Sequence, residues 1–231
     1  LKDGVSRGND SRFFYIGYIR ISGVEDKVTY LNELYQFQLA VRNSGRKLLI
    51  LEGQIPAPGP EEISGVRRKN YANTEQMLAD LAGAICWTAD AVLEKLMRKA
   101  FVEVLAEEED VPGVNLNRLT GHAVYLLCWL KRYAPELFGG PGKTDPGCFI
   151  YLGGCRNGKE AMFVKLLSRL PVDVLLLQPD RNTACTLADP ALYEIHHEQS
   201  MKVERFPKEG QDIRMGTAAY HAERELDEVM Y

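Results

Sequence analysis

The residue types most suggestive of chemistry lie in the segment 153–160, GGCRNGKE. A glycine, four residues and then Gly158 and Lys159 match the phosphate-binding P-loop motif up to that point. In that motif, backbone N–H groups at the amino end of a helix cradle phosphate oxygens. A P-loop continues with a Ser or Thr hydroxyl that binds magnesium, whereas this chain has Glu160. The segment therefore predicts a tight strand-to-helix turn, with a looser phosphate or nucleotide contact as the alternative.

Asp180 is a second candidate, because it follows the apolar run VDVLLL at 172–177. Gly153 and Gly154 begin the turn after the preceding apolar run, so the layout resembles half of a Rossmann fold. An acidic residue after the second strand of such a unit can hydrogen-bond a ribose hydroxyl. The GxGxxG spacing is absent, and a turn or helix-cap role for Asp180 is the competing interpretation.

A basic run, Arg67, Arg68 and Lys69, lies on a long proline-rich connection. Connections of this length are often lids or binding loops, although a solvated charged turn is the alternative. Ligands of open α/β sheets bind beyond the carboxyl ends of the strands. The basic run, the 153–158 turn and Asp180 would all lie there, which predicts a phosphate or nucleotide site.

The cysteines and histidines indicate neither a metal site nor a disulfide framework. Five cysteines occur without a CxxC pair, which is typical of free thiols in a reducing cytoplasm. Among the histidines only His196 and His197 are adjacent, and neighbours in a strand point to opposite faces. We expect no metal, and no GxSxG or Cys–His motif assigns a nucleophile.

The composition is that of a soluble globular protein. The 231 residues are 45% hydrophobic and 26% charged, with a formal net charge of −4. The acidic balance argues against nucleic acid as a partner, and no apolar run is long enough to span a bilayer. We expect a cytoplasmic protein without a membrane partner. Leu1 in place of methionine suggests a portion of a longer protein.

Two similar strand–helix–strand patterns must position the candidate residues. Aromatic and β-branched residues at 13–21 predict a strand, helical spacing follows up to Gly45, and LLIL at 48–51 predicts a buried strand. The same order returns with strands at 148–152 and 172–177. Three helices lie between the patterns, and the first opens with a capping box formed by Asn73 and Gln76.

The predicted fold class is α/β, with Rossmann-like βαβ units at both ends and a helical insertion between them. Either one sheet receives strands from both ends, or two small lobes flank the helices. A further strand is predicted at 202–206 and a final helix at 217–230. The predicted units are an N-terminal βαβ unit with the proline-rich loop (1–72), the helical insertion (73–138), a glycine-rich linker (139–147) and a C-terminal βαβ unit (148–231).

Three stretches carry a resemblance to a known family: FFYIGYIRISGVEDKVTYLNELYQF, LEGQIPAPGPEEI and FIYLGGCRNGKEAMFVKLLSRLPVDVLLLQPD. They resemble the bacterial YceG-like family, named for a "biosynthetic module" beside tellurite-resistance genes. The resemblance covers roughly residues 13–206. It implies a cytoplasmic stress-response protein that acts beside other proteins of the tellurite-resistance module and handles a nucleotide-like small molecule. It supplies no catalytic residues.

Two classes of function follow. The first is a nucleotide- or phosphosugar-handling transferase-like enzyme, and the second is a non-catalytic partner-binding module of the same system. A glycosyltransferase with two facing lobes is a third option. The sequence does not identify the substrate, the reaction or a cofactor. The residues expected to bind phosphate or nucleotide are Arg67, Arg68 and Lys69 as a clamp, Gly153, Gly154 and Lys159 as an anion-binding turn, and Asp180 as ribose acceptor.

Overall fold

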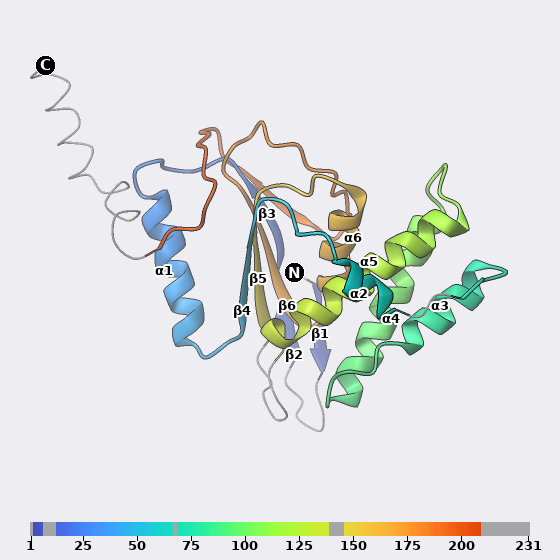
Figure 1. The fold of residues 1–231 in the computed structure, drawn as a ribbon. Helices are drawn as coiled ribbons and strands as arrows, with labels where there is room; N and C mark the ends of the chain where they lie inside the picture. The colour runs from blue at the N-terminus through green and yellow to red at the C-terminus, as the bar shows by residue number, and fades with distance from the viewer. Residues whose placement is uncertain (1, 7–12, 67–68, 139–145, 209–231) are drawn as a thin grey trace, which may run out of the picture.

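A parallel sheet of five strands organises the computed structural model, which describes residues 2–6, 13–66, 69–138 and 146–208 (Figure 1). The strand order is β4-β5-β6-β3-β7. Strands from both predicted βαβ units therefore join one sheet, which confirms the α/β fold class. The predicted unit boundaries stay predictions. The strands are β3 (Tyr18–Ser22), β4 (Leu48–Glu52), β5 (Gly147–Leu152), β6 (Val172–Gln178) and β7 (Tyr193–His196).

The strand predicted at 13–21 is two strands. Residues Phe13–Ile16 form β2, which pairs with β1 (Lys2–Ser6) in a separate antiparallel hairpin. Gly17 separates β2 from β3, and its N–H donates to Asp173 Oδ1 at 2.7 Å. The carbonyl of Gly17 accepts from the N–H of Val174 at 2.8 Å, so both backbone groups of Gly17 contact β6 and the chain joins the larger sheet here.

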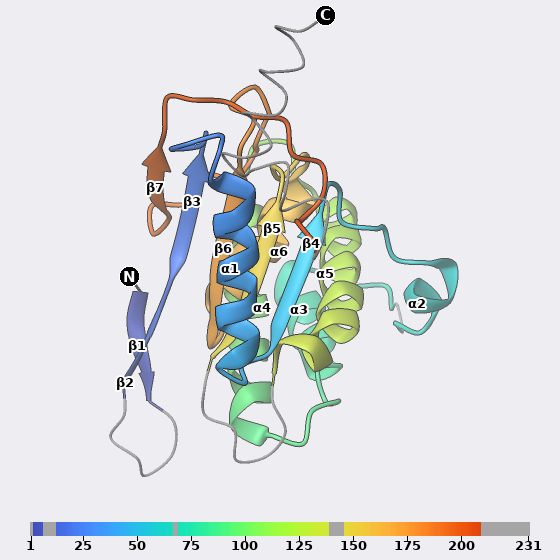
Figure 2. The same ribbon diagram turned by 90° about the vertical axis from the view of Figure 1, so that its left-hand side faces the viewer.

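One face of the sheet is covered by α1 (Tyr30–Asn43) (Figure 2). Its buried Leu31, Leu34 and Val41 pack in one cluster with Cys148 and Ile150 of β5. The predicted helix end is confirmed, since Gly45 follows α1 with a φ of +74°. This left-handed conformation favours glycine, because a side chain there meets the backbone.

The opposite face carries α3 (Thr74–Gly83), α4 (Ala91–Glu109), α5 (Leu116–Leu137) and α6 (Gly158–Leu167), as Figure 1 shows. Phe149 and Tyr151 of β5 point into this larger core. Alternate residues of β5 therefore serve opposite faces, and the strand is buried along its length. This explains why β5 reads as an uninterrupted apolar run.

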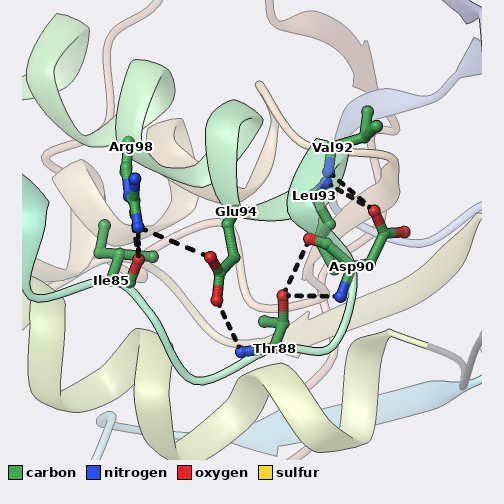
Figure 3. A network of polar contacts seen from close by, with 7 residues as sticks. All are labelled: Ile85, Thr88, Asp90, Val92, Leu93, Glu94 and Arg98. Atoms are coloured by element: carbon green, nitrogen blue, oxygen red, sulfur yellow. Dashed lines mark hydrogen bonds and ion pairs between the residues drawn. The ribbon is translucent and has the colours of Figure 1, made fainter.

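Polar contacts fix the connection between α3 and α4 (Figure 3). Asp90 caps α4 by accepting hydrogen bonds from two first-turn N–H groups at 2.9 and 3.0 Å. The N–H of Thr88 donates to Glu94, and the Arg98 guanidinium donates to the carbonyl of Ile85. The connection is thereby tied to the first two turns of α4.

Asn73 caps α3, as its position in the sequence predicts. Its side chain accepts from the N–H of Gln76 at 2.9 Å. The Gln76 side chain accepts in return from the N–H of Ala72 rather than from that of Asn73 itself. The predicted helix start is confirmed, with the second bond of the capping box displaced by one residue.

The prediction of a strand at 202–206 is wrong. That segment pairs with no strand, and the edge of the sheet is instead β7, where Ile195 lies opposite Ile21 of β3. Phe206 is buried in the core beneath α1, and its N–H donates to Glu52 at 2.8 Å. The apolar residues of 202–206 thus anchor the segment across the sheet edge. The predicted helix at 217–230 lies outside the described residues.

Among the helices that the structure describes, none is both long enough and apolar enough to cross a membrane.

Candidate anion-binding site

Two glycines shape the turn between β5 and α6. Gly153 has a φ of +126°, a conformation that side chains rarely adopt. A Cβ at Gly154 would lie 2.4 Å from the carbonyl oxygen of Ala184 and 2.8 Å from Nε2 of Gln178. The turn therefore requires glycine at both positions, and it packs directly against the segment that follows β6.

The buried carboxylate of Glu160 occupies the inside of this turn. Glu160 has no exposed surface, and its Oε2 accepts from the N–H of Arg156 at 2.6 Å and from the Tyr151 hydroxyl at 3.2 Å. Its Oε1 accepts from the N–H of Ile55 at 3.3 Å. Burial and the nearby Glu160 carboxylate raise the pKa of Tyr151. Glu160 therefore takes an N–H group of the turn for itself and ties the turn to the loop after β4.

A cavity of about 360 Å³ lies beside this turn, beyond the carboxyl ends of β4 and β5. We call it the α5–α6 pocket. Its walls come from the loop after β4, the end of α4, one face of α5 and the first turn of α6. The lining residues are Gln54, Ile55, Ala57, Glu108, Arg118, His122, Tyr125, Trp129, Asn157, Gly158 and Lys159.

Two cations line the pocket at the amino end of α6. The Lys159 ammonium lies over the ring of Tyr125, 3.7 Å from its centroid, a cation–π contact that leaves the charge unneutralised. Arg118 comes from the first turn of α5. Within the described ranges neither cation forms an ion pair, so their positive charge is available to a ligand in the pocket.

His122 lies between these cations and Glu108. Its side chain is buried, with 7% of the residue exposed. Burial lowers the pKa of His122, and the charges of Lys159 and Arg118 lower it further, so the imidazole is neutral at pH 7. Its Nδ1 lies 3.4 Å from Oε1 of Glu108 but makes no hydrogen bond in the described part of the chain. Nδ1 is therefore turned toward Glu108, and a ligand in the pocket would meet the imidazole at its other nitrogen, Nε2.

The proline-rich connection after β4 is held against α5. The indole N–H of Trp129 donates to the carbonyl of Pro56 at 2.8 Å, and Arg132 donates to the same carbonyl at 2.9 Å. Arg132 also pairs with Glu62 of α2 (Pro60–Ser64) and lowers the pKa of that carboxyl group. The wall that this connection contributes to the pocket is therefore fixed by contacts to a long helix.

Of the predicted clamp, Lys69 lies elsewhere. It pairs with Asp80 of α3 and lowers the pKa of that carboxyl group, and the Tyr71 hydroxyl donates to the same carboxylate at 2.9 Å. Lys69 lines a different cavity of about 580 Å³ between α2, α3 and α5. Arg67 and Arg68 lie outside the described residues. The structure thus does not place Lys69 beside Lys159, and a clamp role for the basic run stays a prediction.

Asp180 also lies apart from the pocket lining. Its Oδ1 accepts from the N–H of Asn182 at 3.0 Å and from the hydroxyl of Ser200 at 3.3 Å. The backbone bond from Asn182 is the main cause that lowers the pKa of Asp180. These contacts form an Asx turn, the turn-forming role that the sequence left open. The ribose-acceptor role stays a prediction.

Sequence reasoning missed the α5 side of the pocket, although a signal was present. Arg118, His122, Tyr125 and Trp129 recur at the spacing that aligns side chains along one helix face. Polar and aromatic residues in that pattern mark a helix face turned toward a polar cavity rather than toward the apolar core.

No group of three His, Cys, Asp or Glu side chains is arranged to hold a metal ion within the described ranges.

Comparison with known proteins identifies the family. The YceG domain model matches residues 5–231, almost the whole chain. No curated protein and no solved structure matches the chain. The resemblance seen in the sequence is therefore confirmed, and the chain belongs to the YceG domain family.

Proposed function

We propose that the α5–α6 pocket binds a phosphorylated small molecule, a nucleotide or a phosphosugar. On this proposal the protein is a transferase-like enzyme of a bacterial stress response linked to tellurite resistance. The observation that carries the proposal is that two cations without an ion pair among the described residues, Arg118 and Lys159, line the same pocket as the buried imidazole of His122.

The electrostatics of the pocket favour an anion. At the amino end of α6 the Asn157 side chain caps the N–H of Glu160 and Glu160 accepts from the N–H of Arg156, so the positive charge of the pocket comes from its two cations. Lys159 and Arg118 outnumber the single lining carboxylate, Glu108. The volume of about 360 Å³ lies within the range of small-molecule sites, roughly 300–1,000 Å³. The pocket suits a phosphate group with a modest organic part.

His122 and Glu108 supply the chemistry. The Nε2 atom of the neutral imidazole can accept a proton from a ligand hydroxyl. The Glu108 carboxylate, 3.4 Å from Nδ1, stabilises the imidazolium that forms. Such a step activates a hydroxyl for attack on a phosphoryl or glycosyl group. We assign His122 as the general base and Glu108 as the residue that orients it.

The test is a calorimetric and thermal-shift panel of inorganic phosphate, ADP, ATP, a nucleotide sugar and ribose 5-phosphate. At least one should raise the melting temperature of the wild-type protein. Arg118→Ala and Lys159→Ala should each weaken its binding about tenfold, since a charge-assisted hydrogen bond contributes about 1.5–3 kcal/mol.

Lys95→Ala is the matched control, because Lys95 is an exposed cation on α4 and does not line the pocket. The affinity of this variant for the bound phosphate compound should equal that of the wild type. The proposal fails if no phosphate compound binds. It also fails if binding survives unchanged when Arg118 and Lys159 are replaced together.

A further inference from the structure

Two cysteines far apart in the sequence meet beside the β5–α6 turn. Cys155 lies in that turn, and Cys185 lies in the loop after β6. The N–H and the hydroxyl of Thr186 both donate to the carbonyl of Cys155, at 2.8 and 3.0 Å. Cys185 is the residue before Thr186, so these two bonds bring Cys185 next to Cys155. These contacts therefore hold the two cysteines side by side.

The two thiols have unlike surroundings. Cys155 has no exposed surface, whereas Cys185 is partly exposed. The hydrogen bond from Cys155 lowers the pKa of Cys185, and bonds from the Leu187 N–H and the Arg20 guanidinium add to the effect against the opposing effect of burial. The hydrogen bond to Cys185 and burial raise the pKa of Cys155. Cys185 is thus the cysteine that solvent reaches, with a lowered pKa that favours its thiolate, and Cys155 is its buried partner.

Two contacts fix the position of the Arg20 side chain. It pairs with Glu194 of β7, and it donates to the carbonyl of Leu187 at 3.3 Å. The guanidinium is thereby fixed at Leu187, two residues along the chain from Cys185, and it helps to lower the pKa of that thiol. A partly exposed thiolate beside a cation, backed by a buried second thiol, is the arrangement of redox-active cysteines.

We infer that Cys155 and Cys185 form a redox-active dithiol that hydroperoxides oxidise to a disulfide. The Cys185 thiolate attacks one oxygen of hydrogen peroxide, the O–O bond breaks, and the departing hydroxide takes a proton to become water. Cys185 is then a sulfenic acid. Cys155 attacks that sulfur, the S–O bond breaks, and the departing hydroxide takes the Cys155 proton as a second water. Two thiols and one peroxide thus give one disulfide and two waters.

Cys155 and Cys185 are set apart from the other cysteines by their contact. Cys86 is exposed, and Cys128 and Cys148 are buried on α5 and β5. Burial raises the pKa of Cys148 to about 11, which makes it a poor nucleophile. The inference rests on the contact between Cys155 and Cys185 and on Arg20, and it is independent of ligand binding in the α5–α6 pocket.

The test treats the whole reduced protein with hydrogen peroxide and maps its peptides without reduction. A Cys155–Cys185 crosslink should form, and dithiothreitol should reverse it. In Cys155→Ser, dimedone should label Cys185 as a sulfenic acid. Cys185→Ser should leave Cys155 unmodified at the same peroxide dose, and Cys86→Ser is the matched control that should crosslink as the wild type does.

A second measurement needs no variant. Iodoacetamide at pH 7 should alkylate Cys185 about tenfold faster than exposed Cys86, because the thiolate is the reacting form. Alkylation of Cys86 at an equal or greater rate would overturn the inference. A peroxide-treated wild-type protein that lacks the Cys155–Cys185 crosslink would overturn it as well.

Discussion

At the scale of single residues, the site depends on two buried polar groups that differ in their hydrogen bonding. Glu160 is fully satisfied by three donors, and its role is to join the loop after β4 to the β5–α6 turn. The Nδ1 of His122 makes no hydrogen bond among the described residues and faces the Glu108 carboxylate at 3.4 Å. The first residue builds the pocket, and the second gives the pocket a group with which a ligand can interact.

Replacement of Glu160 tests the first role. Glu160→Gln should lower the free energy of unfolding by about 1–3 kcal/mol. The three donors bind two carboxylate oxygens, whereas an amide offers only one acceptor oxygen. Urea denaturation measures the change. Glu103→Gln on exposed α4 surface is the control and should change stability by less than about 0.5 kcal/mol. Equal stabilities of the two variants would contradict the role of Glu160.

The lowered pKa of His122 predicts a pH dependence of stability. Folding favours the neutral imidazole, so the unfolded chain binds more protons as the pH falls. The stability that the neutral His122 contributes is fully present above the unfolded-state pKa of about 6.5. It is lost as the pH falls through the lower pKa of the folded state. Urea denaturation from pH 7.5 to 5 should show a smaller decline for His122→Gln than for the wild type. His196→Gln, at the exposed sheet edge, should decline as the wild type does.

At the scale of elements, caps and turns explain where helices begin. Two first-turn N–H groups of α4 have no acceptor within the helix, and the Asp90 side chain accepts from both (Figure 3). Asp90→Ala should therefore destabilise the protein by about 0.5–2 kcal/mol, whereas Asp90→Ser should restore most of the loss. Thermal and urea unfolding measure both variants. An alanine variant as stable as the wild type would show that the cap is dispensable.

The same local rules show what could be predicted. Apolar periodicity and caps located α1, α3 and β5, because those signals depend on neighbouring residues alone. They misplaced the edge strand, since 202–206 and β7 are both short and only pairing with β3 decides between them. The division at Gly17 also escaped prediction, because Gly17 contacts Asp173 and Val174 of β6, which are remote in sequence.

At the scale of the whole molecule, the strands of the two ends interleave. β3 lies between β6 and β7, and β4 lies beside β5, so neither end can complete a sheet alone. Local patterns could not distinguish this arrangement from two lobes. The pocket likewise draws on α4, α5, α6 and the loop after β4, which explains why a motif in one segment revealed only Lys159.

Interleaving predicts a single cooperative unit. Residues 1–138 and 139–231, expressed separately, should each lack a cooperative urea transition, since each would expose unpaired strand edges. Mixing the two fragments should restore at least part of the native circular dichroism. Independent cooperative folding of either fragment would contradict the single-sheet account.

The central claim is that a phosphate compound binds beside His122, and an NMR titration of that imidazole tests it most directly. The His122 signals, assigned with His122→Gln, are followed from pH 5 to 8 with and without the best ligand of the panel. We predict that the bound ligand shifts these signals and raises the pKa of His122, because a phosphate anion stabilises the imidazolium. Unchanged signals and an unchanged pKa at a saturating ligand concentration would contradict the account.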